Sequence, residues 1–480
     1  MSQCKTDRKI QMYEYKDTKA NGIIAMLEGF FTRYIVHINI VHAVMFVVLC
    51  ILLFLPLFLS EPLVSDTPLS HFTVTAHYAM WGVWFPLVLL SVVLSGRSWC
   101  GLLCPMGAAS EWVNKKGLRK PIPRWMRWEG TPIVSFIVIT TLGQTVGVRD
   151  HPEAIAEVFG GLMLAAIIIG FIYGNKKRAW CRHMCPVGLL LGVYSRLGAV
   201  EFTQRNKKRI GGDQYQQKGI CPTMIDISAK EESRHCIECF RCVNPKSKGG
   251  LTLRLRRPGE EVENIKAHNP NKAEVWFFFL GTGSALGGFL WLVLPLYQSL
   301  RMQLGEWFIG NEWYWIGDSG PWWLMSVHPE RREVFNWLDF FMIVGFMTAV
   351  MLVVATILYG TTLMASKIAA RVNDSQSSSE WFVQLAYQYM PIAMGSLLIG
   401  LGGELFNLLG LLGLNVDMIK NAKLILIVVC LQWSYYLGYK ILCNQGMSKR
   451  RCIGPLIPGM VGSTAVAVIW YTAIFGGFIL

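Results

Sequence analysis

Three cysteines recur at every third position in Cys236-Ile-Glu-Cys239-Phe-Arg-Cys242, and Cys221-Pro222 lies a short way upstream. Thiolates at this spacing can turn inward around a compact cube of iron and sulfide, and a fourth thiol followed by proline can close the set. A structural Cys4 zinc site is the alternative, although such a site usually shows two separate Cys-x2-Cys pairs. A turn without metal is the remaining interpretation. The pattern favours one [4Fe–4S] cluster on these four cysteines.

The same segment can be aligned with the C-x2-C-x2-C-x3-C-P run of two-cluster bacterial ferredoxins. In that alignment Cys221 is the closing cysteine of a first motif, and the triple run supplies the first three ligands of a second. The other template positions hold no thiol; they fall on Gly211, Gln214, Gln217 and Lys246. Those four positions serve one cluster, so that cluster is lost as a unit and the set for the other is complete.

A second group of cysteines repeats the pattern Cys-x3-Cys-Pro, each time after a basic residue and a tryptophan. The two copies are Cys100-Gly-Leu-Leu-Cys104-Pro105 and Cys181-Arg-His-Met-Cys185-Pro186. Cys-x3-Cys places two thiols about one helical turn apart on one face, and the proline favours the start of a new helix. Two copies on the same side of a membrane could bring four thiols together around a second [4Fe–4S] cluster. Two cysteine pairs without metal, buried or redox-switchable, are the alternative.

The elements that must position these cysteines are membrane helices. The chain has 480 residues, is 53% hydrophobic and carries a net charge of +14. Its basic residues lie in short loops beside apolar stretches, which is the positive-inside pattern and argues against a nucleic-acid partner or a soluble enzyme. Thirteen cysteines, most of them near those loops, suggest cytoplasmic metal ligands rather than a disulfide framework. The first residues, 1–19, lack the apolar core of a cleavable signal peptide.

We expect an all-α polytopic membrane protein of about nine transmembrane helices with a small ferredoxin-like [4Fe–4S] insertion in the cytoplasm. The predicted spans are Tyr34–Leu59, Ala76–Leu94, Pro132–Val148, Ile155–Tyr173, Val275–Leu296, Leu338–Leu358, Pro391–Leu412, Leu424–Leu442 and Leu456–Leu480. The predicted domains are a cytoplasmic segment (1–33), a four-helix membrane domain (34–173), the insertion (174–274) and a five-helix membrane domain (275–480). Leu251–Arg257 alternates and predicts one strand. The N-terminus and the clusters are expected on the cytoplasmic side of the inner membrane.

The order of these motifs resembles the membrane polyferredoxins. The resemblance rests on the two Cys-x3-Cys-Pro motifs and on Cys221-Pro-Thr-Met-Ile-Asp-Ile followed by the triple run, and it covers about Tyr34 to Gly250. Members of that family support periplasmic nitrate reductase and nitrous-oxide reductase, and a relative assists cytochrome oxidase maturation. The resemblance implies electron transfer through the membrane, linked to quinol and an extracytoplasmic reductase. The missing ferredoxin cluster and the five spans after Val275 depart from the pattern, so the substrate is not implied.

Weaker signals concern haem, quinone and isolated thiols. Axial haem ligation uses histidine, and four histidines flank or enter the first two spans; they are His37, His42, His71 and His77, of which His37, His42 and His77 are the candidates. The third and fourth spans contain no histidine to complete a haem b site, so helix packing or a hydrogen bond to quinol is favoured. Glu404 lies in an apolar run and could handle protons beside a quinone, or simply lie near a helix end. Cys443 and Cys452 bracket a basic loop, and their spacing fits no strong site.

The sequence therefore predicts a membrane-bound iron–sulfur protein that transfers electrons between quinone or a partner subunit and another redox partner. Its expected partners are membrane lipid and cytochrome or reductase subunits, in which case it could be a subunit of a membrane oxidoreductase. One alternative is an assembly factor that reduces a metal or thiol on a client oxidase. Another is a transporter whose clusters sense redox state.

Overall fold

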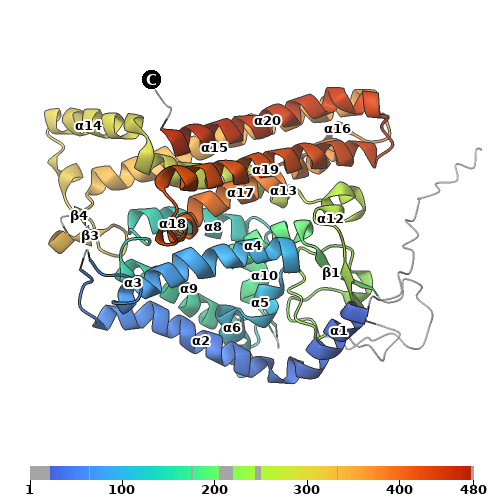
Figure 1. Cartoon of the computed structure of the whole chain (residues 1–480), viewed down its shortest axis with the longest axis horizontal. Coiled ribbons are helices and arrows are strands. Elements are labelled where there is room, and N and C mark those ends of the chain that lie inside the picture. Colours follow the sequence, from blue (N-terminus) through green and yellow to red (C-terminus); the bar gives the residue numbers. More distant parts are fainter. Residues whose placement is uncertain are drawn as a thin grey trace, which may run out of the picture.

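A computed structural model describes residues 22–63, 65–174, 177–204, 220–243, 250–331 and 333–476 (Figure 1). Cys4, Lys176, Leu480 and the four template positions Gly211, Gln214, Gln217 and Lys246 lie outside these residues. Within the described residues, eight helices are long and apolar enough to cross a membrane. They span Ile24–Phe58, Phe72–Ser95, Pro152–Ile172, Lys272–Val293, Trp337–Val372, Ser378–Leu401, Val416–Cys443 and Lys449–Phe475. The chain is a mostly helical, multi-pass membrane protein.

The first spans are composite helices. The first consists of α1 (Gly22–Tyr34), η1 (Ile35–His37), α2 (Ile38–Phe54) and η2 (Leu55–Phe58), and the second of α3 (Phe72–His77), the π-helix η3 (Tyr78–Trp84) and α4 (Phe85–Ser95). The predicted third span is the helix α8 (Thr131–Thr145), and α9 (Pro152–Ile172) follows it. At 1.5 Å per residue the 15 residues of α8 extend only about 22 Å, less than the hydrocarbon core. About nine spans were expected; among the described residues eight helices are long enough to cross a membrane, and the predicted third span is a shorter apolar helix.

The C-terminal half packs around α13 (Lys272–Val293) and α15 (Trp337–Val372), which contact each other along their lengths. The next span joins α16 (Ser378–Ala386), η9 (Tyr387–Tyr389) and α17 (Met390–Leu401), and α18 (Gly403–Leu411) is a separate short helix. The hairpin of α19 (Val416–Cys443) and α20 (Lys449–Phe475) completes the bundle. The predicted starts at Pro391 and Leu456 come too late. Pro391 lies at the first turn of α17, and α20 continues through Pro455 and Pro458, because membrane helices tolerate internal proline.

Short elements join the spans at their two ends. One end carries α5 (Ser98–Leu102), α6 (Pro105–Asn114), α7 (Arg124–Arg127), α10 (Ala179–His183), α11 (Pro186–Tyr194), η4 (Ser195–Leu197), β1 (Val200–Gln204), η5 (Ile227–Ala229), β2 (Leu251–Leu255), α12 (Glu260–Glu263) and η6 (Ile265–Ala267). The other end carries α14 (Pro295–Gly310), η7 (Tyr314–Gly317), β3 (Val327–His328), η8 (Pro329–Arg331) and β4 (Glu333–Val334). Figure 1 shows β1 and α12 at one end of the spans and α14 with β3 and β4 at the other. We call these the cysteine end and the opposite end.

The predicted strand at Leu251–Arg257 is confirmed as β2, which ends at Leu255. It pairs antiparallel with β1, with Phe202 opposite Leu253. The helix α11 also lies within the predicted insertion, residues 174–274, but it is apolar and packs in the main core against α4 and α8. The predicted domain boundaries at residues 33, 174 and 274 remain predictions.

A buried ion-pair network fixes the β1–β2 segment to the helix bundle. Arg196, which is fully buried, pairs with Glu261 of α12 at 2.8 Å and with Glu274 of α13 at 2.9 Å. Arg256 pairs with Glu261 at 2.7 Å and with Glu201 of β1 at 2.6 Å. Buried charges are tolerated only when they are paired and hydrogen-bonded, so these contacts join the segment to the bundle at defined positions.

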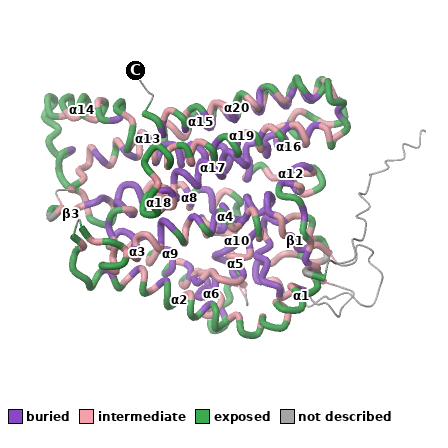
Figure 2. Tube along the Cα trace, in the orientation of Figure 1, coloured by how far each residue is buried: buried purple, intermediate pink, exposed green. Residues whose placement is uncertain are grey.

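Figure 2 shows buried residues along the inner helix faces and exposed ones on the outer surfaces of α2 and α20.

Candidate metal centres

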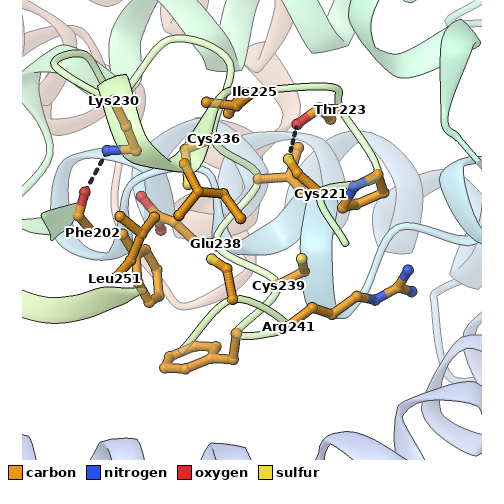
Figure 3. Close-up of a pocket in the computed structure, with 15 residues that line it drawn as sticks. Phe202, Cys221, Thr223, Ile225, Lys230, Cys236, Glu238, Cys239, Arg241 and Leu251 are labelled. Carbon is orange, nitrogen blue, oxygen red and sulfur yellow. Dashed lines mark hydrogen bonds between the residues drawn. The ribbon is translucent and has the colours of Figure 1, made fainter. Parts of the chain in front are cut away.

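Four cysteines of the segment between β1 and β2 surround one cavity, as the sequence predicts. Cys221, Cys236, Cys239 and Cys242 line a pocket of about 390 Å³, part of which is open to solvent. Figure 3 shows Cys221, Cys236 and Cys239 around this space, with Arg241 at its edge. Cys236 and Cys239 are buried, whereas Cys221 and Cys242 are half-buried. The fold thus brings the upstream cysteine to the triple run.

The backbone turns sharply between the cysteines of the triple run. Glu238 (φ 51°) and Phe240 (φ 57°) adopt the left-handed conformation, which is uncommon for residues other than glycine. These two turns let the three thiols return to the same side of the chain. Such conformations persist where the surroundings fix them. Here the Phe240 ring stacks on Phe31 of α1, with centroids 4.3 Å apart, and meets the edge of Phe202 of β1.

The two Cys-x3-Cys-Pro repeats fold alike. In each repeat the first cysteine lies in a one-turn helix, α5 or α10, and the second caps the next helix, α6 or α11. The Cys104 sulfur accepts the N–H of Gly107 at 3.5 Å, and the Cys185 sulfur accepts the N–H of Gly188 at 3.2 Å. The proline after each capping cysteine is the first residue of its helix, where its missing N–H costs no hydrogen bond. The predicted new helix after each motif is confirmed.

Two arginines link the repeats by reciprocal hydrogen bonds, because each donates to the backbone of the other repeat. Arg97, three residues before Cys100, donates from Nη2 to the carbonyl oxygen of Cys181 at 3.0 Å. Arg178, three residues before Cys181, donates from Nη1 to the carbonyl oxygen of Cys100 at 2.7 Å. Both arginines are at most 2% exposed. Each repeat therefore supplies a buried cation that holds the first cysteine of the other repeat.

Burial and neighbouring thiols raise the pKa values of three repeat thiols, those of Cys104, Cys181 and Cys185. Burial raises the pKa of Cys104 to about 11, and the neighbouring Cys100 adds to the rise. Burial raises the pKa of Cys181 to about 12; Cys104 and Cys100 add to this shift, and Arg178 opposes it. Burial also raises the pKa of Cys185, and Cys181, Cys104 and Cys100 add to the rise. These thiols are protonated at neutral pH, so binding a metal group as thiolates releases their protons.

Both sets of sulfur atoms fit a cluster better than a single metal ion. Zinc binds thiolates at about 2.3 Å, so the sulfurs of a tetrahedral site lie about 3.8 Å apart. Neither cysteine set places three sulfur atoms within 4.8 Å of one another. Among the described residues, the group that meets this limit is His151, Glu153 and His328. In addition, Nη2 of Arg178 is buried and has no hydrogen-bond partner within the described chain, so it is a donor available to a cluster sulfide.

The two cysteine sites are in direct contact. Gly101, between Cys100 and Cys104, packs so tightly on the triple run that a Cβ atom there would overlap the carbonyl oxygen of Ile237. The same Cβ would lie 2.9 Å from the backbone nitrogen of Cys239. The backbone N–H of Arg178 donates to the carbonyl oxygen of Pro222, the residue after Cys221, at 2.8 Å. The elements that hold one site therefore form part of the wall of the other.

Glu111 of α6 connects the two sites through charge. Its carboxylate accepts a hydrogen bond from Arg178 at 2.8 Å and another from Arg241 of the triple run at 2.6 Å. Burial opposes ionisation of this carboxyl, but Arg178 and Arg241 outweigh it and hold its pKa at about 2. Glu111 is therefore ionised at neutral pH and shields two cations from each other.

The weaker sequence candidates lie apart from one another. His42 is buried beside the backbone of Gly101, and His37 is exposed on η1. His77 lies at the opposite end, where its Nε2 is 3.8 Å from a carboxylate oxygen of Glu404. His77 also lines a cavity of about 310 Å³ with Asp150, Thr73 and apolar residues. His77 and Glu404 are thus brought together, whereas the three histidines are not arranged as a haem pair.

Arg97, Arg178 and Glu111 were not singled out from the sequence as site residues. The repeat of Arg-x-Trp-Cys before each motif is the signal that could have identified the two arginines. Glu111 offers no such signal, because its partner Arg241 lies 130 residues away in the chain.

Comparisons with known proteins find a 4Fe-4S match over the two repeats, and the matched residues end before the triple run. The family described as "4Fe-4S binding domain" matches residues 79–124 and 158–208, which contain the two Cys-x3-Cys-Pro motifs. An uncharacterized protein of Methanocaldococcus jannaschii is 26% identical over 175 residues, which is 35% of this chain and 68% of that protein. Ferredoxin-type protein NapH of Haemophilus influenzae is 25% identical over 39% of this chain and 71% of its own length.

Methylamine utilization ferredoxin-type protein MauN of Paracoccus denitrificans is 28% identical over 25% of this chain and 46% of its own length. No solved structure matches. All these matches cover well under half of the chain. Over part of its length the chain is therefore similar to ferredoxin-type proteins, and residues 79–124 and 158–208 match a 4Fe-4S binding domain.

Proposed function

We propose that this protein holds two [4Fe–4S] clusters side by side at the cysteine end and serves as a one-electron relay there. Cys100, Cys104, Cys181 and Cys185 would hold one cluster, and Cys221, Cys236, Cys239 and Cys242 the other. When bound, each cluster supplies a centre that accepts and gives up single electrons. The named ferredoxin-type relatives support this class of function.

The observation that carries the proposal is the direct contact between the two sites. The backbone of Gly101 lies against Ile237 and Cys239, so no intervening side chain separates the two ligand loops at this point. Two redox centres that share a wall suit a relay, whereas two independent structural sites need no such contact. The arrangement therefore favours electron transfer over a purely structural use of the metal.

The buried cations around the first site have a clear electrostatic role. A cluster bound by four thiolates is an anion, and burial of an anion is costly unless positive charge accompanies it. Arg97 and Arg178 provide that charge from within the protein, and Arg178 is also close enough to Cys239 to act on the second site. These two residues orient the ligand loops and favour the more negative, reduced state.

We propose that the direct electron partner docks at the cysteine end. The cavity of His77 and Asp150 offers polar groups to a quinone, but it lies at the opposite end. The helix α9 connects Pro152 beside that cavity to the cysteine end, and its 21 residues extend about 32 Å. A quinone at His77 and Glu404 is too far from the clusters for direct exchange, so a link to quinol requires a partner subunit or a further carrier.

We further propose that the cysteine end faces the cytoplasm. The basic residues of the loop 115–127 and of Lys449–Arg451 all lie at this end, which agrees with the positive-inside pattern. Single cysteines near Lys116 and near Gly320, in a background that keeps the cluster ligands, test the orientation with a membrane-impermeant maleimide on intact cells. We expect labelling near Gly320 alone. Labelling near Lys116 alone would invert the assignment.

The relay itself is tested by electron paramagnetic resonance of the protein purified without oxygen and reduced with dithionite. We expect two reduced clusters whose spectra broaden each other because the sites share a wall. In Cys104→Ser the remaining spectrum should lose this broadening and keep the shape of a single cluster. Two signals that are independent of each other in the wild type would contradict the relay.

A further inference from the structure

A pair of cysteines outside both metal sites lies at the turn between α19 and α20. The Sγ atoms of Cys443, the last residue of α19, and Cys452, in the first turn of α20, are 3.3 Å apart. Their spacing in the sequence fits no metal motif. The two sulfur atoms are in van der Waals contact, and a disulfide bond is about 2.05 Å long. A small movement of the two side chains would therefore allow a bond between them.

The turn that presents the pair is held in place from two sides. Gly446 takes φ of +87°, which closes the short turn between the helices. Gln445 donates from its side chain to Gln384 of α16 at 2.5 Å. Asn444 donates to the carbonyl oxygen of Glu263 of α12 at 3.1 Å. The pair therefore lies at the cysteine end of the molecule, on a fixed turn.

The two thiols differ in access. Cys452 is fully buried, and its Sγ lies 3.7 Å from the carbonyl oxygen of Met447, to which it donates. Cys443 is half-buried and so can be reached from solvent. An accessible thiol beside a buried one is the arrangement of an attacking and a resolving cysteine in thiol–disulfide exchange. Three exposed basic residues, Lys449, Arg450 and Arg451, precede Cys452 and favour an anionic reactant.

We propose that Cys443 and Cys452 form a two-electron thiol–disulfide exchange site for an anionic disulfide. The Cys443 thiolate attacks one sulfur of RS–SR, which forms a mixed disulfide and releases the first RS⁻. Cys452 then attacks Cys443, which forms the Cys443–Cys452 disulfide and releases the second RS⁻. The two cysteine protons end on the two leaving groups. In total, two cysteine thiols are oxidised and one disulfide is reduced to two RSH.

This site is separate from the one-electron relay and does not rest on it. It uses neither set of cluster ligands, and its reaction needs only the disulfide substrate. Disulfides in a reducing compartment are usually transient, catalytic or redox-sensing, which suits a pair at an end that we assign to the cytoplasm. A covalent link here would also tie α19 to α20 at the turn.

The test uses the full-length protein in detergent, with glutathione disulfide as the anionic probe. After anaerobic incubation, free thiols are alkylated and the peptides are analysed by mass spectrometry without reduction. We expect a Cys443–Cys452 disulfide in the wild type and a stable glutathione adduct on Cys443 in Cys452→Ser. In Cys443→Ser we expect Cys452 to remain unmodified, because it is buried.

Cys430→Ser is the matched control, since Cys430 is buried in α19 and lies 13 residues before Cys443. It should form the same Cys443–Cys452 disulfide as the wild type. The visible absorption of the clusters, measured on every variant, reports separately on the relay and on folding. Free, alkylatable Cys443 and Cys452 in folded wild-type protein at glutathione disulfide excess would overturn the proposal. So would a glutathione adduct on Cys443 in the wild type that is never resolved by Cys452.

Discussion

The two cysteine sites hold their thiols by different means. The repeat site is built twice from the same parts: a one-turn helix, a capping cysteine, a proline and an arginine that crosses to the other copy. The triple-run site has no such symmetry and depends on left-handed turns at Glu238 and Phe240. One site is positioned by short helices at the ends of membrane spans, and the other by a loop packed on a two-stranded sheet and α1.

The comparison indicates that the repeat site supports the triple-run site more than the reverse. Arg178 is the residue that belongs to both, since it holds the repeat site and pairs with Glu111, which holds Arg241. Loss of Arg178 should therefore affect both sites, whereas loss of a single repeat-site thiol should leave the triple-run cluster in place. Damage confined to the triple run should leave the repeat site intact.

The largest effect is expected from Arg178→Leu. Removing one partner of a buried ion pair costs about 3–5 kcal/mol, and here the loss also frees the Cys100 carbonyl. We expect iron to fall at both sites and the protein to melt at a lower temperature. Arg257→Leu is the matched control, because that side chain is 69% exposed, and it should behave as wild type. Full iron content in folded Arg178→Leu would show that the two sites do not depend on Arg178.

The next effect is the loss of one site alone. We expect Cys221→Ser and Cys239→Ser to abolish the same spectroscopic signature, although the two cysteines come from different loops around the cavity. The signature of the repeat site should survive in both variants, because none of its ligands is changed. A signature lost in one variant and kept in the other would show that Cys221 is not the fourth ligand.

A smaller effect is expected from Gly101→Ala, which adds one methyl group at the contact between the sites. The added Cβ would overlap the Ile237 carbonyl, so the loops must shift, at a cost of about 1–3 kcal/mol. We expect both clusters to remain while the magnetic interaction between them weakens. Gly161→Ala in α9 is the control, since a Cβ there meets nothing within 4 Å. An unchanged interaction in Gly101→Ala would show that this contact does not set the cluster separation.

The smallest effect is one of pH. The Glu111 pKa is about 2 in the folded protein against an ordinary 4.5, because Arg178 and Arg241 outweigh its burial. A lowered carboxyl pKa stabilises the folded state above pH 4.5, and this stabilisation is lost as pH falls toward 2. The difference in melting temperature between wild type and Glu111→Gln should therefore be constant from about pH 8 to pH 5 and shrink below that. A difference that already changes between pH 8 and pH 5 would contradict the assigned pKa.

Much of this site follows from the sequence, because its information is local. The spacing of the triple run and the repeated Cys-x3-Cys-Pro pattern predicted which cysteines lie together, and the proline after each motif predicted the helix start. Apolar length predicted most spans, but not that α8 is shorter than a bilayer or that α20 runs through Pro455 and Pro458. Proline is a poor marker of helix boundaries where lipid requires the backbone to stay hydrogen-bonded.

The residues that join the two sites could not be predicted, because their contacts are long-range. Glu111 meets Arg241 across 130 residues, and the Arg97 guanidinium meets Cys181 across 84. The close approach at Gly101 brings together the loop of the first repeat and the triple run, and no local sequence pattern indicates that these two loops meet. The pairing of Cys443 with Cys452 likewise depends on how α19 and α20 turn, and the spacing alone did not suggest it.

The most direct test of the two-cluster account is the metal and sulfide content of protein purified without oxygen. We expect about eight irons and eight acid-labile sulfides per chain, falling to about four of each in Cys104→Ser and in Cys242→Ser. Stoichiometric zinc without sulfide, or about four irons in the wild type, would contradict it.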